Sequence, residues 1–425
     1  MLQMIKEPIA ILIKNNVDKK TFIARILSKN APSKLQHYNN LKGLLFSDIA
    51  IEKFIEEEYR YDIVKVATSS NKKLSNFSTG ERRKVFLKYC LSQQPDFILF
   101  DSILDHLDSA SQIELAKNIE KISTNIQIIQ LANSTNDILS FIKTKYEIAD
   151  NTFSLQKLQN QKHVILSDFK NEIPASLKNI DFKGDTLVKF NNVCVNYNEK
   201  PIVKNINWTV KKGEFWQLIG PNGSGKSTLL SLITGENPKA YGQDIHIFGY
   251  KKGSGESVWD LKKRIGIFST TLTELFSRNQ TLEHLILSGY FDSIGLYTKP
   301  QKKQFFAVEQ WLKIIHLAAY KNTPFLKLSL GQQRLALIIR ALIKQPPLLI
   351  LDEPLEGLDD ENTTLVTQLI NLLILKTEIT IIYVSHRIEP RLKPISILQL
   401  SPSKKGSLGN IINNKDLKKL IRSNT

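Results

Sequence analysis

The sequence predicts an α/β fold with parallel strands at its centre, built twice along the chain. Three observations predict it: a glycine-rich loop between a buried strand and a helix at residues 216–235, an apolar run that ends in Asp352 and Glu353, and spacings that both halves share. At 425 residues the chain is long enough for two domains with separate cores. The predicted parts are a first domain at 1–156, a polar linker at 157–185 and a second domain at 186–425.

The glycine-rich loop, "GPNGSGKST", has the full pattern of a phosphate-binding loop. Its three glycines let the backbone approach phosphates closely, so that successive amide groups can donate to them. Lys226 is expected to bridge the β- and γ-phosphates of a nucleotide, and a helix from residue 227 to about residue 233 adds its positive end. The expected nucleotide-binding residues here are Gly220, Pro221, Asn222, Gly223, Ser224, Gly225, Lys226, Ser227 and Thr228.

The apolar run at residues 348–351 is typical of a fully buried parallel strand. Asp352 at its end is expected to hold Mg²⁺ together with the Ser227 hydroxyl, and Glu353 is expected to polarise the water that attacks the γ-phosphate. A later strand leads into His386, which is expected to donate to the γ-phosphate. The expected catalytic residues are therefore Asp352, Glu353 and His386.

Residues 186 to about 400 resemble an ATP-binding cassette (ABC) domain of the P-loop NTPase type. The resemblance rests on the phosphate loop, the signature "LSLGQ" at 328–332, the Asp-Glu strand, the "GLD" that ends at Asp359, and the histidine that follows. It implies a mixed sheet with flanking helices plus a helical subdomain, ATP and Mg²⁺ as cofactors, and hydrolysis of ATP to ADP and phosphate. It also implies that Tyr197 stacks on adenine.

One position departs from the family pattern. The stretch "RIGIFST" ends in Ser269 and Thr270, where the family usually has a glutamine that helps to bind Mg²⁺ and signals to a membrane partner. The coupling to a permease that the resemblance implies therefore lacks its usual residue in this chain.

The two halves of the chain repeat one unit at an offset of 251 residues. Ser78 and Asp101 are 23 residues apart, as are Ser329 and Asp352, and a further aspartate follows 7 residues later in each half. The first half is therefore expected to be a second cassette in tandem. It is shortened, because about 44 residues are absent between its loop and its signature.

Substitutions in the first half are expected to have removed its own nucleotide chemistry. Ser102 stands at the position of the second carboxylate, and a hydroxyl cannot accept a proton at neutral pH as a carboxylate does. Asn133 stands at the position of the histidine. Lys19 falls on the loop lysine, but Asn16 and Asp18 occupy glycine positions, where they obstruct the amide cradle and Asp18 repels phosphate.

The first half has nevertheless kept a signature, "FSTGE" at 77–81. Alone, this stretch reads as a simple helix cap, but the matched spacings favour a signature. In ABC proteins two cassettes are similarly found head to tail, each loop closed by the other signature. The resemblance therefore implies that Ser78, Gly80 and Glu81 complete the site of the second half, and that the converse site is silent.

The whole chain is similar to molybdenum-transport or photorepair-type ATP-binding proteins, most densely over 186–400 and with "ILSGYFDSIGLY" at 286–297. Two functions stay open. One is to energise the import of an oxyanion such as molybdate through a separate permease subunit. The other is a soluble ATPase that acts on a ribosome, DNA or a protein partner. A module that binds nucleotide but hydrolyses it slowly is disfavoured by the intact Glu353.

The formal net charge of +17 comes from lysines spread along the chain, without an arginine-rich stripe interleaved with aromatics. No sequence-specific binding of nucleic acid is therefore expected. No apolar run approaches the roughly 18 residues that span a bilayer. The expected location is the cytoplasm, or the inner face of the plasma membrane if a permease partner exists, and a homodimer stays open.

Overall fold

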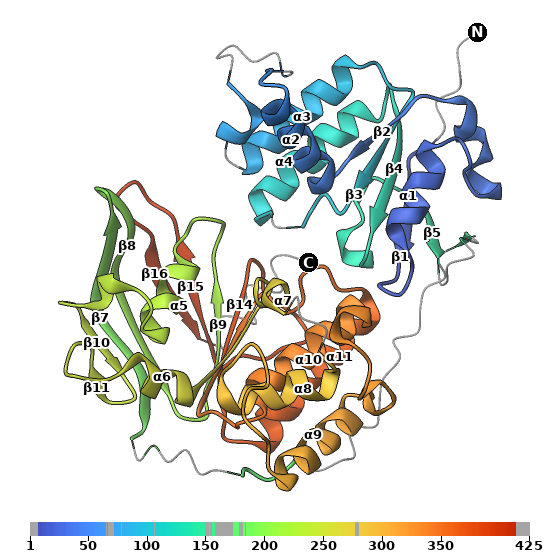
Figure 1. Ribbon diagram of the computed structural model, residues 1–425. Coiled ribbons are helices and arrows are strands. Elements are labelled where there is room, and N and C mark those ends of the chain that lie inside the picture. The colour runs from blue at the N-terminus through green and yellow to red at the C-terminus, as the bar shows by residue number, and fades with distance from the viewer. Residues whose placement is uncertain are drawn as a thin grey trace. The chain divides into compact units, whose positions relative to one another are not determined.

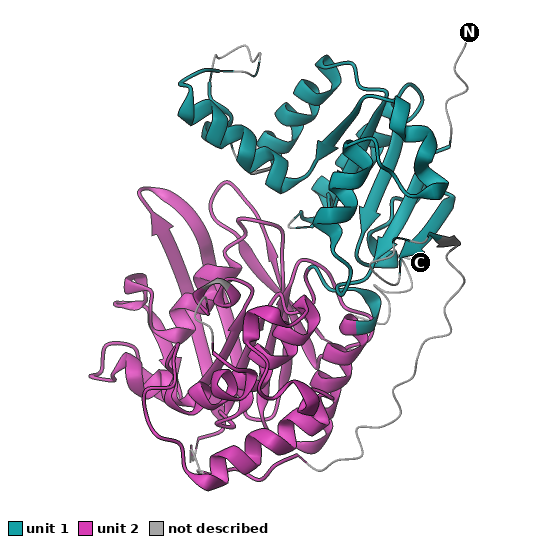
Figure 2. Cartoon of the chain, turned by 45° about the vertical axis from the view of Figure 1, so that its right-hand side comes forward, with its two compact units in different colours: residues 1–164, 357–361 teal, residues 165–356, 362–425 magenta. Residues whose placement is uncertain are grey.

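The structure is a computed structural model that divides into two compact units, shown in two colours in Figure 2. Unit 1 comprises residues 1–164 and 357–361, and unit 2 comprises 165–356 and 362–425. The domain limits expected from the sequence stay a prediction. The residues whose structure is described are 7–64, 66, 72–77, 79–105, 107–148, 153, 155–157, 173–177, 182, 184–276 and 280–413. Ser78 of the first signature and most of the expected linker lie outside them.

Unit 1 contains a six-stranded sheet in the order β2-β3-β4-β1-β5-β6 (Figure 1). Its first five strands are parallel, and β6 pairs antiparallel with β5. The strands are β1 (Ile9–Ile13), β2 (Gly43–Phe46), β3 (Phe97–Asp101), β4 (Gln127–Ala132), β5 (Thr144–Ile148) and β6 (Gln156–Lys157). The helices are α1 (Lys19–Leu27), η1 (Ser33–Asn40), α2 (Asp48–Arg60), η2 (Leu74–Asn76), α3 (Thr79–Ser92), α4 (Ser109–Ile122) and η3 (Thr135–Asp137).

Both faces of the unit 1 sheet are buried, which explains the continuous apolar sequence of its strands. In β3, Ile98 and Phe100 belong to one apolar cluster, and Phe97 and Leu99 belong to another. The first cluster includes buried residues of α2, α3 and α4, and the second includes those of α1 and η1. Successive side chains of a strand point to opposite faces, so these helices form two layers around the sheet.

Unit 2 contains a six-stranded sheet and a separate four-stranded antiparallel sheet (Figure 1). The six-stranded order is β12-β13-β14-β9-β15-β16 and the four-stranded order is β11-β10-β7-β8. The strands are β7 (Thr186–Tyr197), β8 (Lys200–Lys211), β9 (Phe215–Ile219), β10 (Asp244–Ile247), β11 (Tyr250–Lys251), β12 (Ile265–Ser269), β13 (Leu348–Asp352), β14 (Thr380–Ser385), β15 (Ser396–Ser401) and β16 (Leu408–Asn413).

The helices of unit 2 include a group between β12 and β13 that corresponds to the expected helical subdomain (Figure 1). No helix among the described residues combines the length and the apolar character that crossing a bilayer requires. The helices are α5 (Lys226–Thr234), η4 (Pro238–Ala240), α6 (Val258–Arg264), α7 (Leu272–Leu275), α8 (Leu282–Ser288), η5 (Gly289–Phe291), α9 (Lys302–Ile314), η6 (Ala318–Tyr320), η7 (Phe325–Lys327), α10 (Leu330–Leu342) and α11 (Asp360–Lys376).

The two units repeat the same strand order, with β1 in the place of β9 and β2, β3 and β4 in those of β12, β13 and β14. The register agrees as well: Phe46 pairs with Phe100 in unit 1, and Phe268 pairs with Leu351 in unit 2. The described part of unit 1 has no counterpart of the four-stranded sheet. The prediction of tandem α/β cassettes with a shortened first copy is therefore confirmed.

Candidate nucleotide-binding site

The phosphate loop of unit 2 connects the buried strand β9 to α5, as the sequence predicts. Gly225 has a φ of +97° and is the N-cap residue of α5. A Cβ atom added there would lie 2.5 Å from Val203 Cγ1, so torsion and space both require glycine. The loop therefore delivers the start of a nine-residue helix to the site, with Lys226 as its first residue.

Lys226, His386 and Glu353 form a chain of contacts. The Lys226 ammonium donates to the carbonyls of Gly220 at 2.7 Å and Pro221 at 3.3 Å, and its Nζ lies 3.2 Å from His386 Nδ1. An ammonium only donates, so Nδ1 is the acceptor and Nε2 carries the imidazole proton. That Nε2 atom lies 2.6 Å from Glu353 Oε1, to which it donates. The loop lysine therefore fixes the tautomer of the histidine that contacts Glu353.

Asp352 ends β13 in a partly buried position beside this chain. The pKa of its carboxyl is raised to about 6, mainly by burial and next by the neighbouring charge of Glu353, while Lys226 opposes the shift. Ser227, in the first turn of α5, is exposed. A hydroxyl and a carboxylate supply the hard oxygen ligands that Mg²⁺ prefers, and a cation would favour the ionised form of this carboxyl. The two residues therefore fit the metal that the sequence predicts.

Tyr197, the last residue of β7, is 40% exposed and keeps part of its ring open to a ligand. Its hydroxyl accepts a hydrogen bond from the side-chain amide of Asn237 at 2.7 Å. Asn237 is buried and also donates to Ser231 of α5 at 2.9 Å. The ring is thus tied to the helix that starts at the phosphate loop.

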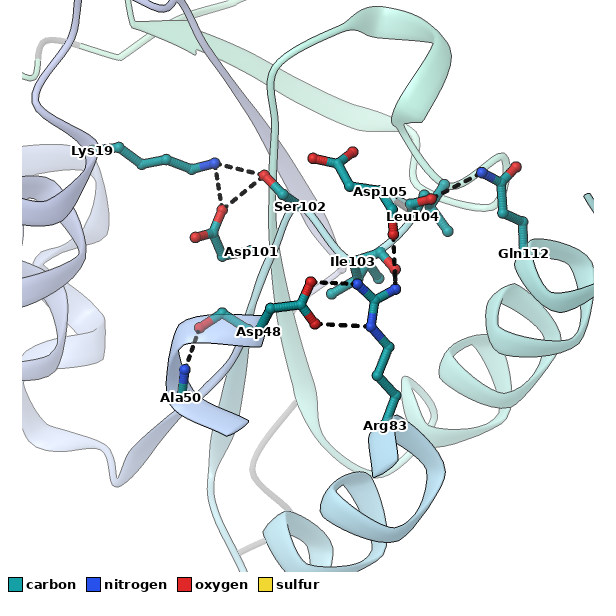
Figure 3. Close-up of polar contacts among 11 residues, drawn as sticks. Lys19, Asp48, Ala50, Arg83, Asp101, Ser102, Ile103, Leu104, Asp105 and Gln112 are labelled. Carbon is teal, nitrogen blue, oxygen red and sulfur yellow. Dashed lines mark hydrogen bonds and ion pairs between the residues drawn. The ribbon is translucent and has the colours of Figure 1, made fainter. Parts of the chain in front are cut away.

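The corresponding place in unit 1 has different chemistry (Figure 3). The Lys19 ammonium forms an ion pair with Asp101 and donates to Ser102 Oγ at 2.7 Å and Asn133 Oδ1 at 3.3 Å. These three partners occupy the positions of Asp352, Glu353 and His386, respectively. Asp18 caps α1 by accepting from the Thr21 amide at 3.1 Å. The lysine of unit 1 therefore pairs directly with a carboxylate, whereas Lys226 donates to two neutral carbonyls and faces an imidazole.

The signature helices of the two units also differ. In unit 2, Ser329 caps α10 in a capping box with Gln332. A Cβ atom added to Gly331 would lie 2.0 Å from the Asn362 side chain, so packing within unit 2 explains that glycine. A Cβ atom added to Gly80 would meet no described atom within 4 Å, and the φ of Gly80 is not positive. Neither torsion nor packing among the described residues requires glycine at position 80.

The comparisons with known proteins agree with this geometry. The model of the ABC transporter family matches residues 203–356. The ABC transporter ATP-binding protein ModF of Escherichia coli is 39% identical over 334 residues, which are 75% of this chain and 68% of ModF. The chain belongs to the family of ABC transporter ATP-binding proteins. It is an ABC-type ATPase, and ATP is its nucleotide.

A second relative of this ABC ATPase is the uncharacterized ABC transporter ATP-binding protein C323.04 of Schizosaccharomyces pombe, which is 29% identical over 67% of this chain and 60% of its own length. Among solved structures, this chain resembles one chain in the complex of the archaeal ribosomal stalk protein aP1 and the archaeal ribosome recycling factor aABCE1. The match covers 99% of this chain and 89% of the matched chain. The TM-score is 0.64 at 15% identity, a likeness that shows the fold.

The sequence placed the main site residues on the correct elements but missed several contacts. It did not identify Asn237 as the partner of Tyr197, or Glu356 as a neighbour of Glu353 and His386. Single ligand atoms of Glu353, Glu356 and His386 lie within 4.8 Å of one another. The sequence signal for Glu356 was its position three residues after Glu353, in the turn that follows β13.

Proposed function

We propose that this ABC ATPase hydrolyses ATP at one composite site, in which the phosphate loop of unit 2 is completed by the signature of unit 1. The contrast between Lys19 and Lys226 supports a single productive loop. Incoming phosphate oxygens can displace the carbonyls to which Lys226 donates, because the ammonium is attracted more strongly by a charged phosphate than by a neutral carbonyl. At Lys19 a phosphate would have to displace the carboxylate of Asp101.

The proposed binding roles follow the sequence prediction. Tyr197 stacks on adenine, and the loop from Gly220 to Thr228 holds the phosphates, with Lys226 between the β- and γ-phosphates. Ser227 and Asp352 would hold Mg²⁺, and the ion would neutralise charge on the transferred phosphate. The residues of the loop are Gly220, Pro221, Asn222, Gly223, Ser224, Gly225, Lys226, Ser227 and Thr228.

The proposed catalytic base is Glu353, which takes up the proton of the attacking water. Its contact with His386 holds the carboxylate in place before the nucleotide binds. His386 then reorients its Nε2–H toward the γ-phosphate, which frees the carboxylate for the water. The unit 1 counterparts, Ser102 and Asn133, can do neither step.

The proposed contribution of unit 1 is the signature residues Ser78, Gly80 and Glu81. The glycine at position 80 supports this role. Neither its torsion nor its packing among the described residues requires glycine, and close approach of a ligand to the backbone is another reason why a glycine can be needed. Glu81 lies in the first turn of α3, the helix whose start would face the γ-phosphate.

The number of nucleotides bound per chain tests the single productive loop. Equilibrium binding of a fluorescent ATP analogue should saturate at one per chain, should be lost in Lys226→Met and should be retained in Lys19→Met. Saturation at two per chain, with half of the sites lost in each variant, would show that both loops bind nucleotide.

For the biological role, we propose that hydrolysis energises transport of a substrate, an oxyanion such as molybdate, through a separate permease at the inner face of the plasma membrane. The relationship to ModF supports a transport system, and the oxyanion rests on the sequence resemblance alone. The alternative is a soluble cytoplasmic ATPase that acts on a ribosome, DNA or a protein partner. Thr270 favours it, because the family's coupling glutamine is absent.

Affinity purification of the tagged chain from its native host distinguishes the two roles. Recovery with a membrane permease from detergent extracts supports transport. Recovery with ribosomes, DNA or a soluble protein, and without a permease, supports the alternative.

A further inference from the structure

At a buried arginine of unit 1, Arg83 on α3, each of the three guanidinium nitrogens donates at least one hydrogen bond (Figure 3). Arg83 is 3% exposed. Its Nε and Nη2 atoms donate to the two carboxylate oxygens of Asp48 at 2.9 and 2.5 Å. Its Nη1 atom donates to the carbonyls of Ile103 at 2.9 Å and Asp105 at 3.0 Å. The planar guanidinium is thus satisfied by one two-pronged carboxylate and two backbone oxygens, the geometry that such groups favour.

The repeat gives this arginine a counterpart in unit 2. Arg83 stands five residues after Ser78, and Arg334 on α10 stands five residues after Ser329. The paired strands give the counterpart of Asp48: Phe46 and Phe268 share one register position, and two residues later the chain has Asp48 in unit 1 and Thr270 in unit 2. Unit 2 has the arginine, but it has a threonine at the position of the carboxylate that faces the arginine in unit 1.

Arg334 is consequently buried without its ligand. It is 8% exposed, and neither its Nε nor its Nη1 atom has a hydrogen-bond partner among the described residues. Its guanidinium carbon lies 5.5 Å from the centre of the Phe268 ring. Burial lowers the pKa of Arg334, and the charges of Glu356 and Glu353 oppose that shift. A buried guanidinium with unmade hydrogen bonds is costly, so a ligand that makes them would bind with a gain in free energy.

We propose that Arg334 is a binding site for the carboxylate of an acidic side chain from a partner protein, which takes the place that Asp48 takes in unit 1. The Asp48 side chain is 44% exposed in unit 1, and Thr270 at the matching position of unit 2 is partly exposed, so this position is within reach of solvent. The chain carries a net charge of +17, which favours an acidic partner. On α7, which packs against α10, Leu275 is 51% exposed and offers an apolar contact.

The test measures the thermal unfolding midpoint, Tm, of the full chain with added carboxylate at constant ionic strength. The probes are sodium acetate and a short peptide with blocked ends and a single aspartate, with the asparagine peptide as control. At about ten times the dissociation constant, both carboxylates should raise Tm by roughly 2–4 °C. The rise should be absent in Arg334→Met and in Thr270→Asp, which fills the position from within the chain, and present in Thr270→Asn.

Asp48→Ala is the positive control, because it vacates the same position beside Arg83 and should make unit 1 respond to acetate. If Arg334→Met does not fold, Thr270→Asp still tests the assignment. An equal rise in Tm with acetate in wild type and Thr270→Asp, or no rise in wild type while Asp48→Ala responds, overturns the proposal. A rise in Tm with phosphate that equals the rise with the aspartate peptide and that Thr270→Asp abolishes describes a site for inorganic anions beside Arg334 and overturns the proposal too.

Discussion

His386 donates through Nε2 to Glu353 at 2.6 Å while Nδ1 faces the Lys226 ammonium at 3.2 Å. Glu353→Gln should therefore keep ATP binding and lower steady-state ATP hydrolysis by about 10²- to 10⁴-fold, because a general base is lost. Phosphate release measures turnover, and nucleotide binding is measured alongside. The matched control is Ser102→Ala at the counterpart position, where turnover should stay within about twofold. Full activity in Glu353→Gln would remove Glu353 from the mechanism.

The two signature serines should respond differently to the same change. Ser78→Arg should abolish ATP hydrolysis, because a large cation would occupy the position proposed to face the γ-phosphate. Ser329→Arg should leave turnover within about twofold. It should lower stability by roughly 1 kcal/mol, since the Ser329 hydroxyl caps α10. Phosphate release and thermal unfolding are the measurements. The composite site is wrong if Ser78→Arg hydrolyses ATP at the wild-type rate.

Gly80→Ala separates a role in folding from a role at the nucleotide. The added methyl group would meet no described atom within 4 Å, so Tm should not fall. If the phosphate approaches this backbone closely, the methyl group should obstruct it, and turnover should fall at least about tenfold. A tenfold fall corresponds to roughly 1.4 kcal/mol in the activation free energy. Gly331→Ala gives the contrasting result, with a lower Tm, because its methyl group would lie 2.0 Å from Asn362. Unchanged turnover in Gly80→Ala would count against the signature role.

Lys19→Met tests whether the ammonium of unit 1 serves the fold. The change leaves the Asp101 carboxylate, whose side chain is 11% exposed, without its ion-pair partner. Unfolding in urea should show that the free energy of unfolding falls by about 1–3 kcal/mol, while ATP turnover stays unchanged. Adding Asp101→Asn should recover part of that stability, because the uncompensated charge is removed. A loss of turnover in Lys19→Met with intact folding would assign a nucleotide role to Lys19.

The raised pKa of Asp352 predicts a pH dependence. Its carboxyl has a pKa of about 6 in the folded chain against an ordinary value of 3.8, so between these values the folded chain binds more protons than the unfolded chain. Stability from this group is present at low pH and is lost as pH rises toward 6. The free energy of unfolding of Asp352→Asn should therefore exceed that of wild type by on the order of 1–3 kcal/mol at pH 7, with a smaller difference at pH 4. Urea unfolding without Mg²⁺ measures it, and an equal difference at both pH values would contradict it.

Much of the site could be predicted because its signals are local in sequence. The glycine loop, the Asp352 and Glu353 pair and the matched spacings require no knowledge of tertiary structure, and the helix expected at 227–233 is α5, which spans Lys226–Thr234. The strand order could not be predicted, since parallel strands joined by helices can be arranged in several orders.

Contacts between distant segments also could not be predicted. The partners of Lys19 come from β3 and the end of β4, 83 and 114 residues away for Ser102 and Asn133. The sequence showed that Lys19 corresponds to Lys226, but the choice of Asp101 as its counter-ion depends on side-chain geometry. The unmade hydrogen bonds of Arg334 were missed for the same reason. The register of β12 is what identifies Thr270 as the counterpart of Asp48.

The ion pair between Asp101 and Lys19 also has a consequence for the ATP hydrolysis cycle, in which the two units would take different parts. Unit 1 carries its own counter-ion, so its loop is electrically complete whether nucleotide is present or absent. If unit 2 has the single productive loop, the arrival of ATP and the departure of ADP would change the charge balance at Lys226 and leave that at Lys19 as it is. A partner that senses the nucleotide state would then have to contact unit 2.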